Sequence, residues 1–446
     1  MTAEKSLRFR AILGPAGIER DRTVDIGPDG RIRDIRSGSG PFDGFLALPG
    51  LTNAHSHAFQ RALAGFGEAA SGEASFWSWR DAMYRLAARV TPERLFDIAR
   101  RAYSEMLRGG FTRVIEFHYL HHGPDGARGT AMAEAVTDAA GEVGLPITFL
   151  PVYYRTSGFD GAPATADQAR FSFVSVDEFL SWIETLGSRA DGAAPHSLRA
   201  VPPAELDTLA TGIRDLLGED APLHIHVSEQ TREVAECEER FGATPIDLLM
   251  DTVSVDRRWS LVHATHATPS ERERIRTSGA TVVLCPLTEA YLGDGVFEAR
   301  EHSRAGGFAA VGTDANTRLS AADELRCLEY GQRLRDERRA RLANERGLGS
   351  SLWSWLVEGG ARAAGHTDHG LRAGAPADLV VLDPGGPALL GHEPESALDA
   401  WLIGGDDRDI AAVYVAGAVK ARGGTIPDED EIADRFAGTL RAIWAD

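Results

Sequence analysis

Short apolar segments recur along the middle of the chain, and stretches with the periodicity of amphipathic helices lie between several of them. Residues 130–144 and 175–187 show the helical pattern most clearly. The eight apolar segments are residues 45–55, 112–120, 146–154, 197–203, 223–230, 259–266, 281–289 and 309–316. Near-continuous hydrophobicity of this kind is typical of strands in a parallel sheet that is covered on both faces. Eight such strands alternating with helices predict an α/β fold, a (β/α)8 barrel of the TIM type.

The two ends of the chain follow a different pattern. Residues 7–35 contain β-like runs around an Asp-Gly turn, which is typical of a hairpin. Residues 378–383 and 410–424 are also β-rich and contain glycine turns. We therefore expect both ends to meet in a small β-sandwich domain. The expected boundaries are residues 1–47 with 370–446 for this domain and residues 48–369 for the barrel.

Composition and charge exclude several classes of protein. The chain of 446 residues carries 66 acidic and 47 basic side chains, a formal net charge of −19. Nucleic-acid binders usually have a basic face, so we expect neither nucleic acid nor an anionic membrane surface as a partner. No apolar run approaches the ~20 residues that cross a bilayer, and no signal peptide is apparent. Three widely spaced cysteines favour the reducing cytoplasm over a disulfide framework.

Histidines stand near the C-terminal ends of two predicted strands, on the face where a (β/α)8 barrel carries its active site. The first segment ends in His55-Ser56-His57. Residues i and i+2 of a strand point the same way, so these imidazoles suit one metal ion, unless they are surface histidines of a loop. The fifth segment contains His224 and His226. We interpret His226 as the inward ligand and His224 as a packed neighbour.

Acid–base groups follow the later segments. Glu229 comes three residues after His226. This spacing predicts that its carboxylate lies beside the metal ion and is not one of the ligands. His263 stands where the strand of the sixth segment is expected to end and is suited to holding a water molecule, although a core histidine is the alternative. Asp314 ends the eighth segment. Because carboxylates are rarely buried unless they are paired or bound to metal, we expect Asp314 to be both a ligand and a proton acceptor.

These residues together predict a hydrolytic metal site. Its expected ligands are His55, His57, His226 and Asp314. Nitrogen and oxygen ligands of this kind suit one divalent ion, with Zn²⁺ as the first choice and Fe²⁺ or Mn²⁺ as alternatives. Zinc can lower the pKa of water to about 7, which makes hydroxide available at neutral pH.

The order HxH, His, His, Asp on successive strands resembles the amidohydrolase superfamily over nearly the whole chain. Some members bridge two metals through a carbamylated lysine, but the two lysines here are Lys5 and Lys420, outside the expected barrel. The HxxE motif instead resembles the mononuclear deaminase branch. Longer segments are similar to those of formimidoylglutamate deiminases, namely PGLTNAHSHAFQRALAGFG, SFWSWRDAMYRL, EFHYLHH, APHSLRAV, LHIHVSEQ and CPLTEAYLGDGVF.

This resemblance implies an activity and a substrate. The activity would be the hydrolysis of N-formimino-L-glutamate to N-formyl-L-glutamate and ammonia, in histidine degradation. The substrate contacts that it implies are Gln60, Tyr119, His196 and Arg199. A guanidinium such as that of Arg199 suits bidentate carboxylate binding, although a structural salt bridge is the alternative. The segment DANTRLS stands where the family usually has a serine-rich stretch, which leaves the details of that loop open.

The resulting hypothesis assigns the three catalytic roles. Asp314 accepts a proton from the attacking water, His263 orients that water, and Glu229 protonates the imine nitrogen. We expect SFWSWRDAMYRL to pack as a lid or helix over the site, and the chain to form a homodimer. The closest alternative is a related deaminase acting on a nucleobase or on another anionic amidine, and Arg199 argues against a nucleobase. A barrel without catalysis is a second alternative, against which Glu229 and the four ligands argue.

Overall fold

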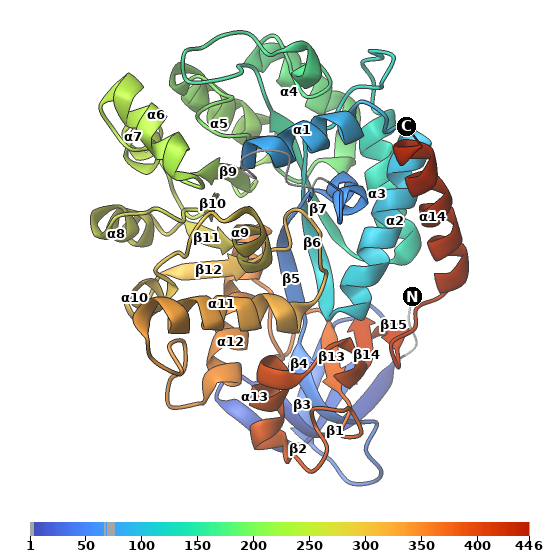
Figure 1. Cartoon of the computed structure of the whole chain (residues 1–446). Coiled ribbons are helices and arrows are strands. Elements are labelled where there is room, and N and C mark those ends of the chain that lie inside the picture. The colour runs from blue at the N-terminus through green and yellow to red at the C-terminus, as the bar shows by residue number, and fades with distance from the viewer. Residues whose placement is uncertain (1–3, 67, 69–75, 446) are drawn as a thin grey trace.

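The computed structural model describes residues 4–66, 68 and 76–445, and a parallel barrel forms its centre (Figure 1). Eight strands pair in the order β8-β7-β6-β5-β12-β11-β10-β9, and bridges from Ala193 to Leu223 and from Ser197 to His226 connect the two end strands. The strands are β5 (Leu51–Ser56), β6 (Phe111–His118), β7 (Ile147–Tyr153), β8 (Ala194–Pro195), β9 (Leu223–Val227), β10 (Trp259–His263), β11 (Thr281–Leu284) and β12 (Phe308–Val311). The predicted (β/α)8 barrel is confirmed.

Helices surround these strands and bury them on their outer face (Figure 1). The two clearest predicted helices form as α3 (Ala131–Val143) and α4 (Val176–Leu186). The other helices of the barrel are α1 (Phe76–Ala87), α2 (Pro92–Arg108), α5 (Pro203–Leu217), α6 (Thr231–Phe241), α7 (Pro245–Thr252), α8 (Pro269–Ser278), α9 (Pro286–Leu292), α10 (Ala299–Arg304), α11 (Ala321–Asp336) and α12 (Leu348–Ala363). Among the described residues, no helix has the length and apolar character needed to cross a membrane.

The barrel interior is filled by small and branched side chains. Residues from six of the strands are fully buried in one cluster with Ala363, the last residue of α12, and Ala364 after it, and β11 with its end contributes two of them. They are Ala54, Ile115, Leu150, Val262, Val283, Cys285 and Ala310. A packed interior leaves no pore through the barrel, so chemistry is confined to its ends.

Both ends of the chain build one mixed sheet of seven strands, ordered β15-β14-β13-β4-β1-β2-β3. Its strands are β1 (Lys5–Gly14), β2 (Gly17–Ile26), β3 (Ile32–Ser37), β4 (Gly44–Pro49), β13 (Leu379–Leu382), β14 (Ile410–Val415) and β15 (Ala418–Arg422). The small β domain from both termini is thus present. Two helices accompany it in the sequence, α13 (Pro394–Gly404) and α14 (Glu429–Trp444), and α14 lies along α2 of the barrel (Figure 1).

Two predicted strands differ from those observed. The apolar run 45–55 contains both β4 of the small sheet and β5 of the barrel, separated by Gly50. A Cβ atom at position 50 would lie 2.2 Å from Thr112 Oγ1, so the absence of a side chain lets the chain pass between the sheets. The fourth barrel strand is β8, which lies before the predicted run 197–203. Pro202 and Pro203 in that run start α5 instead.

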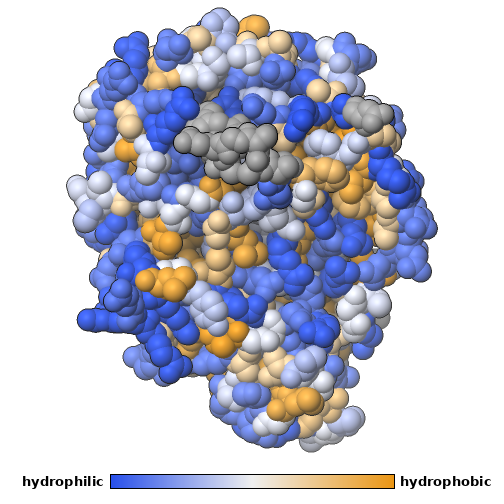
Figure 2. Space-filling view, viewed as in Figure 1, coloured by the Kyte–Doolittle hydropathy of each residue, from blue (hydrophilic) through white to orange (hydrophobic). Residues whose placement is uncertain are grey.

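The surface carries mainly hydrophilic residues on the face that Figure 2 shows. Hydrophobic residues form small separate groups on this face. Single exposed hydrophobic residues of this kind are normal on a folded domain.

Candidate active site

Three imidazoles and one carboxylate converge at the C-terminal ends of β5, β9 and β12. His55 Nε2 lies 3.2 Å from His57 Nε2 and 2.9 Å from His226 Nε2. Asp314 Oδ1 lies 3.2 Å from His57 Nε2 and 3.6 Å from His55 Nε2. One atom from each of the four residues lies within 4.8 Å of all the others, and all four residues are buried.

This donor set fits a metal ion. Burial lowers the pKa values of His55 and His226 well below the usual range, and the neighbouring imidazoles lower them further, so both rings are neutral. His57 Nδ1 lies 2.9 Å from the carbonyl oxygen of Phe117, so Nδ1 carries the proton and Nε2 points a lone pair at the cluster. Several lone pairs and a carboxylate face one another at hydrogen-bond distance in a buried place. A bound cation would balance the negative charge of the carboxylate and accept the lone pairs of the imidazoles.

His263 lies beside this cluster at the end of β10, between three carboxylates. Its Nε2 is 3.8 Å from Glu229 Oε1 and 3.7 Å from Asp314 Oδ2, and its Nδ1 is 3.2 Å from Glu289 Oε1 on α9. Burial alone lowers the pKa of His263, but the three carboxylates outweigh burial and raise it to about 10. Burial raises the pKa of Glu229, and the charge of Asp314 adds to this effect. The site therefore holds a buried acid–base pair next to the candidate metal site.

Backbone strain occurs at the same strand ends. His263 has a φ of 67° and Asp314 a φ of 46°, both in the left-handed region that non-glycine residues rarely adopt. Strain of this kind persists where the surrounding structure holds a side chain in a required direction. Here it turns both side chains towards one point above the barrel.

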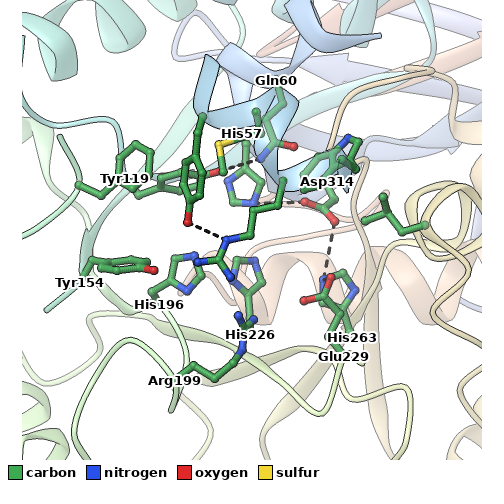
Figure 3. Close-up of a pocket in the computed structure, with 16 residues that line it drawn as sticks. His57, Gln60, Tyr119, Tyr154, His196, Arg199, His226, Glu229, His263 and Asp314 are labelled. Atoms are coloured by element: carbon green, nitrogen blue, oxygen red, sulfur yellow. Dashed lines mark hydrogen bonds and ion pairs between the residues drawn. The ribbon is translucent and has the colours of Figure 1, made fainter. Parts of the chain in front are cut away.

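The predicted substrate contacts line the same pocket (Figure 3). Gln60 belongs to η1 (Ala58–Leu63), the short 3-10 helix that follows His57, and its Nε2 donates to Tyr119 Oη at 2.7 Å. His196 and Arg199 follow β8, and Arg199 lies across the pocket from Asp314 (Figure 3). Burial opposes ionisation of Arg199, but the charges of Glu233 and Glu229 outweigh this and raise its pKa. The pocket thus carries a cationic end opposite an anionic end.

Comparisons with known proteins agree with this geometry. Residues 46–420 match the amidohydrolase family. The chain belongs to that family. It is 41% identical over 447 residues to formimidoylglutamate deiminase of Pseudomonas aeruginosa, covering 97% of each chain. It is 29% identical over 90% of its length to 5-methylthioadenosine/S-adenosylhomocysteine deaminase of Halobacterium salinarum, covering 86% of that protein. The crystal structure of an amidohydrolase from Brucella melitensis superposes with a TM-score of 0.92 at 40% identity, covering 98% of this chain and 99% of that one.

The structure of the present chain also places residues in the pocket that the sequence motifs did not single out. Arg80 and Tyr84 of α1 line it, as do Tyr154 and Phe171. Arg80 Nε donates to Tyr84 Oη at 2.6 Å. Arg80 is the second guanidinium of the pocket lining, beside that of Arg199. The signal was the i, i+4 spacing of Arg80 and Tyr84, which puts both on one helix face. The expected helix over the site is α1; the side chain of Trp77 lies outside the described residues, and Trp79 lines the pocket.

His224, His266 and Cys285 lie near the ends of the same strands but are absent from the pocket lining. His224 Nε2 lies 2.8 Å from the carbonyl oxygen of Ala363, below the site. Cys285 is fully buried in the barrel core. Burial raises the pKa of the Cys285 thiol well above its usual value, which keeps the thiol protonated and unreactive.

In the present chain, the loop after Asp314 contains a buried network of side-chain amides. Asn316 has a φ of 55°, a conformation that asparagine tolerates better than most residues. Its Nδ2 donates to the carbonyl oxygen of His57 at 2.9 Å and to Ser56 Oγ at 3.1 Å, while its Oδ1 accepts from Thr313 Oγ1 at 2.5 Å. Asn53 Nδ2 in turn donates to Thr313 Oγ1 at 2.7 Å. These bonds join the loop that carries Asp314 to the strand that carries the two histidines.

Proposed function

We propose that this chain hydrolyses N-formimino-L-glutamate to N-formyl-L-glutamate and ammonia in histidine degradation. The observation that carries the proposal is the 41% identity, over 97% of both chains, to formimidoylglutamate deiminase of Pseudomonas aeruginosa. The charge distribution of the pocket supports it. The substrate has a basic formimino group on its α-nitrogen, one carboxylate on the α-carbon and a second carboxylate at the end of its side chain. The pocket has Arg199 and Arg80 on its wall and Glu229 and Asp314 near the candidate metal site.

We propose one divalent ion, with Zn²⁺ as the first choice, held by the four converging residues. These ligands are His55, His57, His226 and Asp314. When bound, the ion supplies Lewis acidity that lowers the pKa of water from about 15.7 to about 7.

The chain's own groups move the protons. Asp314 accepts one proton from the attacking water, and His263, held through Nδ1 by Glu289, orients that water through Nε2. The water oxygen bonds to the formimino carbon. Glu229, whose pKa burial raises, donates its proton to the imine nitrogen, which leaves a tetrahedral carbon with one hydroxyl and one amino group. Asp314 then passes the proton taken from water to the amino nitrogen, and the hydroxyl proton returns to Glu229. The bond from carbon to this nitrogen breaks, and ammonia leaves. The product keeps the water oxygen as its formyl oxygen.

Substrate recognition falls to the opposite wall of the pocket. Arg199 provides a charged donor for one carboxylate, and Gln60, Tyr119 and His196 add neutral hydrogen-bonding groups. Arg80 offers a second guanidinium, as a dianion requires. A nucleobase offers no carboxylate to these arginines, so the nucleobase alternative fits this wall less well.

The substrate is tested by ammonia release from purified protein whose metal content has been measured. N-formimino-L-glutamate is compared with N-formimino-L-aspartate, cytosine and guanine. Rapid release from N-formimino-L-glutamate, with little from the other three, is the expected result. Release from a nucleobase alone, or none from N-formimino-L-glutamate with a metal-loaded sample, would overturn the proposal.

Replacing Arg199 by alanine is expected to raise KM about 30-fold or more and to change kcat much less. Loss of one partner of a buried charged pair costs about 2–5 kcal/mol, and a contact that is equally strong in ground and transition states appears in KM. Steady-state ammonia release measures both constants. Arg155→Ala is the matched control, because Arg155 pairs with Glu205 outside the pocket lining. An unchanged KM in Arg199→Ala removes this residue from substrate binding.

We further propose that the enzyme is a cytoplasmic homodimer. Its three cysteines are free, as expected in a reducing compartment. Leu334 on α11 is 81% exposed, Tyr330 on the same helix is 38% exposed, and Val296 lies against this helix at Gly331. These residues form an exposed apolar group that a second copy would cover. Light scattering of the purified protein measures its mass in solution and decides the oligomeric state.

A further inference from the structure

The last helix of the chain is fastened to the outside of the barrel. α14 leaves the small sheet after β15 and runs along α2 towards the active-site end (Figure 1). Asp97 of α2 accepts from Arg435 Nε at 2.8 Å and from Thr439 Oγ1 at 2.9 Å. Arg108 of α2 donates to Glu429 Oε1 at 2.8 Å. These bonds hold α14 against the barrel from its first turn to its last third.

The end of α14 reaches the short helix that carries Gln60. Trp444 Nε1 donates to the carbonyl oxygen of Ala62, the fifth residue of η1, at 3.0 Å. The Trp444 ring also stacks on Phe66, with centroids 4.3 Å apart and an interplanar angle of 9°. Arg89 Nη1 donates to the carbonyl oxygen of Ile443 at 2.6 Å, which fixes the backbone beside Trp444. The last turn of α14 therefore contacts both the end of η1 and the residues that follow it.

η1 needs support of this kind. It has six residues, and 3-10 geometry is weak beyond three or four residues. Its first residue, Ala58, is held by the hydrogen bond from its N–H to Glu116 Oε1 at 2.7 Å, whereas the end of η1 is held by Trp444. It starts directly after His57, and its residue Gln60 donates to Tyr119 Oη inside the pocket. A displacement of η1 would move this amide out of place, because substrate-binding groups must be held within about 0.5 Å.

We propose that Trp444 is a positioning residue for substrate binding, acting through η1 on Gln60. The identity of the bound substrate rests on the proposed function, whereas the contact between Trp444 and η1 does not. Without Trp444, η1 samples arrangements in which Gln60 is misplaced. A competent fraction of about one tenth raises the apparent KM about tenfold. Turnover of the bound substrate changes little, because Trp444 contacts none of the acid–base residues.

Steady-state kinetics of three variants test this inference. Trp444→Ala is expected to raise KM for N-formimino-L-glutamate about tenfold and to change kcat less than threefold. Trp444→Phe retains an aromatic ring to stack on Phe66, loses the bond to Ala62, and is expected to lie between Trp444→Ala and wild type. Trp355→Ala is the matched control, since Trp355 of α12 is also half-buried and donates to a backbone carbonyl, that of Gly307, at 2.9 Å. We expect it to leave KM unchanged. An unchanged KM in both Trp444 variants overturns the inference.

A double-mutant cycle separates positioning from general destabilisation. If Trp444 acts through Gln60, Trp444→Ala adds no further increase in KM when Gln60 is already alanine. An equal increase in both backgrounds shows that Trp444 acts elsewhere and contradicts the proposal.

Amide hydrogen exchange gives a readout that needs no turnover. Exchange in residues 58–66 is expected to be faster in Trp444→Ala than in wild type or Trp355→Ala. Wild-type protein that does not act on N-formimino-L-glutamate overturns the proposed substrate, and exchange then still decides whether Trp444 holds η1. If Trp444→Ala fails to fold, Trp444→Phe decides in the same way, and normal exchange in residues 58–66 of that variant contradicts the inference.

Discussion

Replacing Glu229 by glutamine is expected to lower kcat by about 10²–10⁴-fold, the usual contribution of general acid–base catalysis. Glutamine has nearly the same shape, but its amide is not an acid and cannot transfer a proton to the imine nitrogen. Glu229 is buried beside His263 and is absent from the four-residue group that fits a metal ion. The variant is therefore expected to fold and to retain its metal.

The measurement combines kcat from ammonia release with metal content from elemental analysis. Glu239→Gln is the control, because Glu239 is exposed on α6, the helix that follows Glu229. Wild-type turnover in Glu229→Gln would remove this residue from the mechanism. Loss of metal together with activity would show that Glu229 supports the metal site and would contradict a purely acid–base role.

Removal of the metal is expected to abolish turnover and to lower stability. Without a cation, the imidazoles of His55, His57 and His226 and the carboxylate of Asp314 face one another uncompensated in a buried place. A ligand that binds only the folded state stabilises it by about 4 kcal/mol at a thousandfold excess over its Kd. Chelation should therefore lower the thermal midpoint, and addition of Zn²⁺ should restore both the midpoint and activity.

The same experiment identifies the preferred ion. Aliquots of the chelated protein receive Zn²⁺, Fe²⁺ or Mn²⁺, and ammonia release is compared at equal occupancy. Full turnover in protein shown to be free of metal would reject the metal-dependent mechanism.

Much of the fold could be predicted because strands buried on both faces leave a continuous apolar run. The runs 223–230, 259–266 and 281–289 contain β9, β10 and β11. The run 45–55 was harder, because strands of two different sheets are equally apolar and only Gly50 separates them. The fourth strand is two residues long, too short to produce a pattern of its own.

The centre of the site was predictable for a similar reason. Residues i and i+2 of a strand share a face, and His55 and His57 do meet, with their Nε2 atoms 3.2 Å apart. The roles given to these and to the catalytic residues stay predictions until they are measured. Arg80 reaches the pocket from a helix, and Trp444 reaches η1 from the far end of the chain. The i, i+4 spacing puts Arg80 and Tyr84 on one face of α1, but it does not say what this face covers. That contact and the one made by Trp444 depend on how distant elements pack.

The position of β4 has a consequence for synthesis of the protein. β4 lies between β1 and β13, and its Pro49 pairs with Leu379. A ribosome adding about 5–20 residues per second needs roughly 15–70 s to make the intervening chain. During that time the apolar edge of β4 has no partner and is a template for pairing with other nascent chains. Aggregation during expression is therefore expected to depend on how fast the ribosome reaches β13, and slower elongation through the barrel should worsen it.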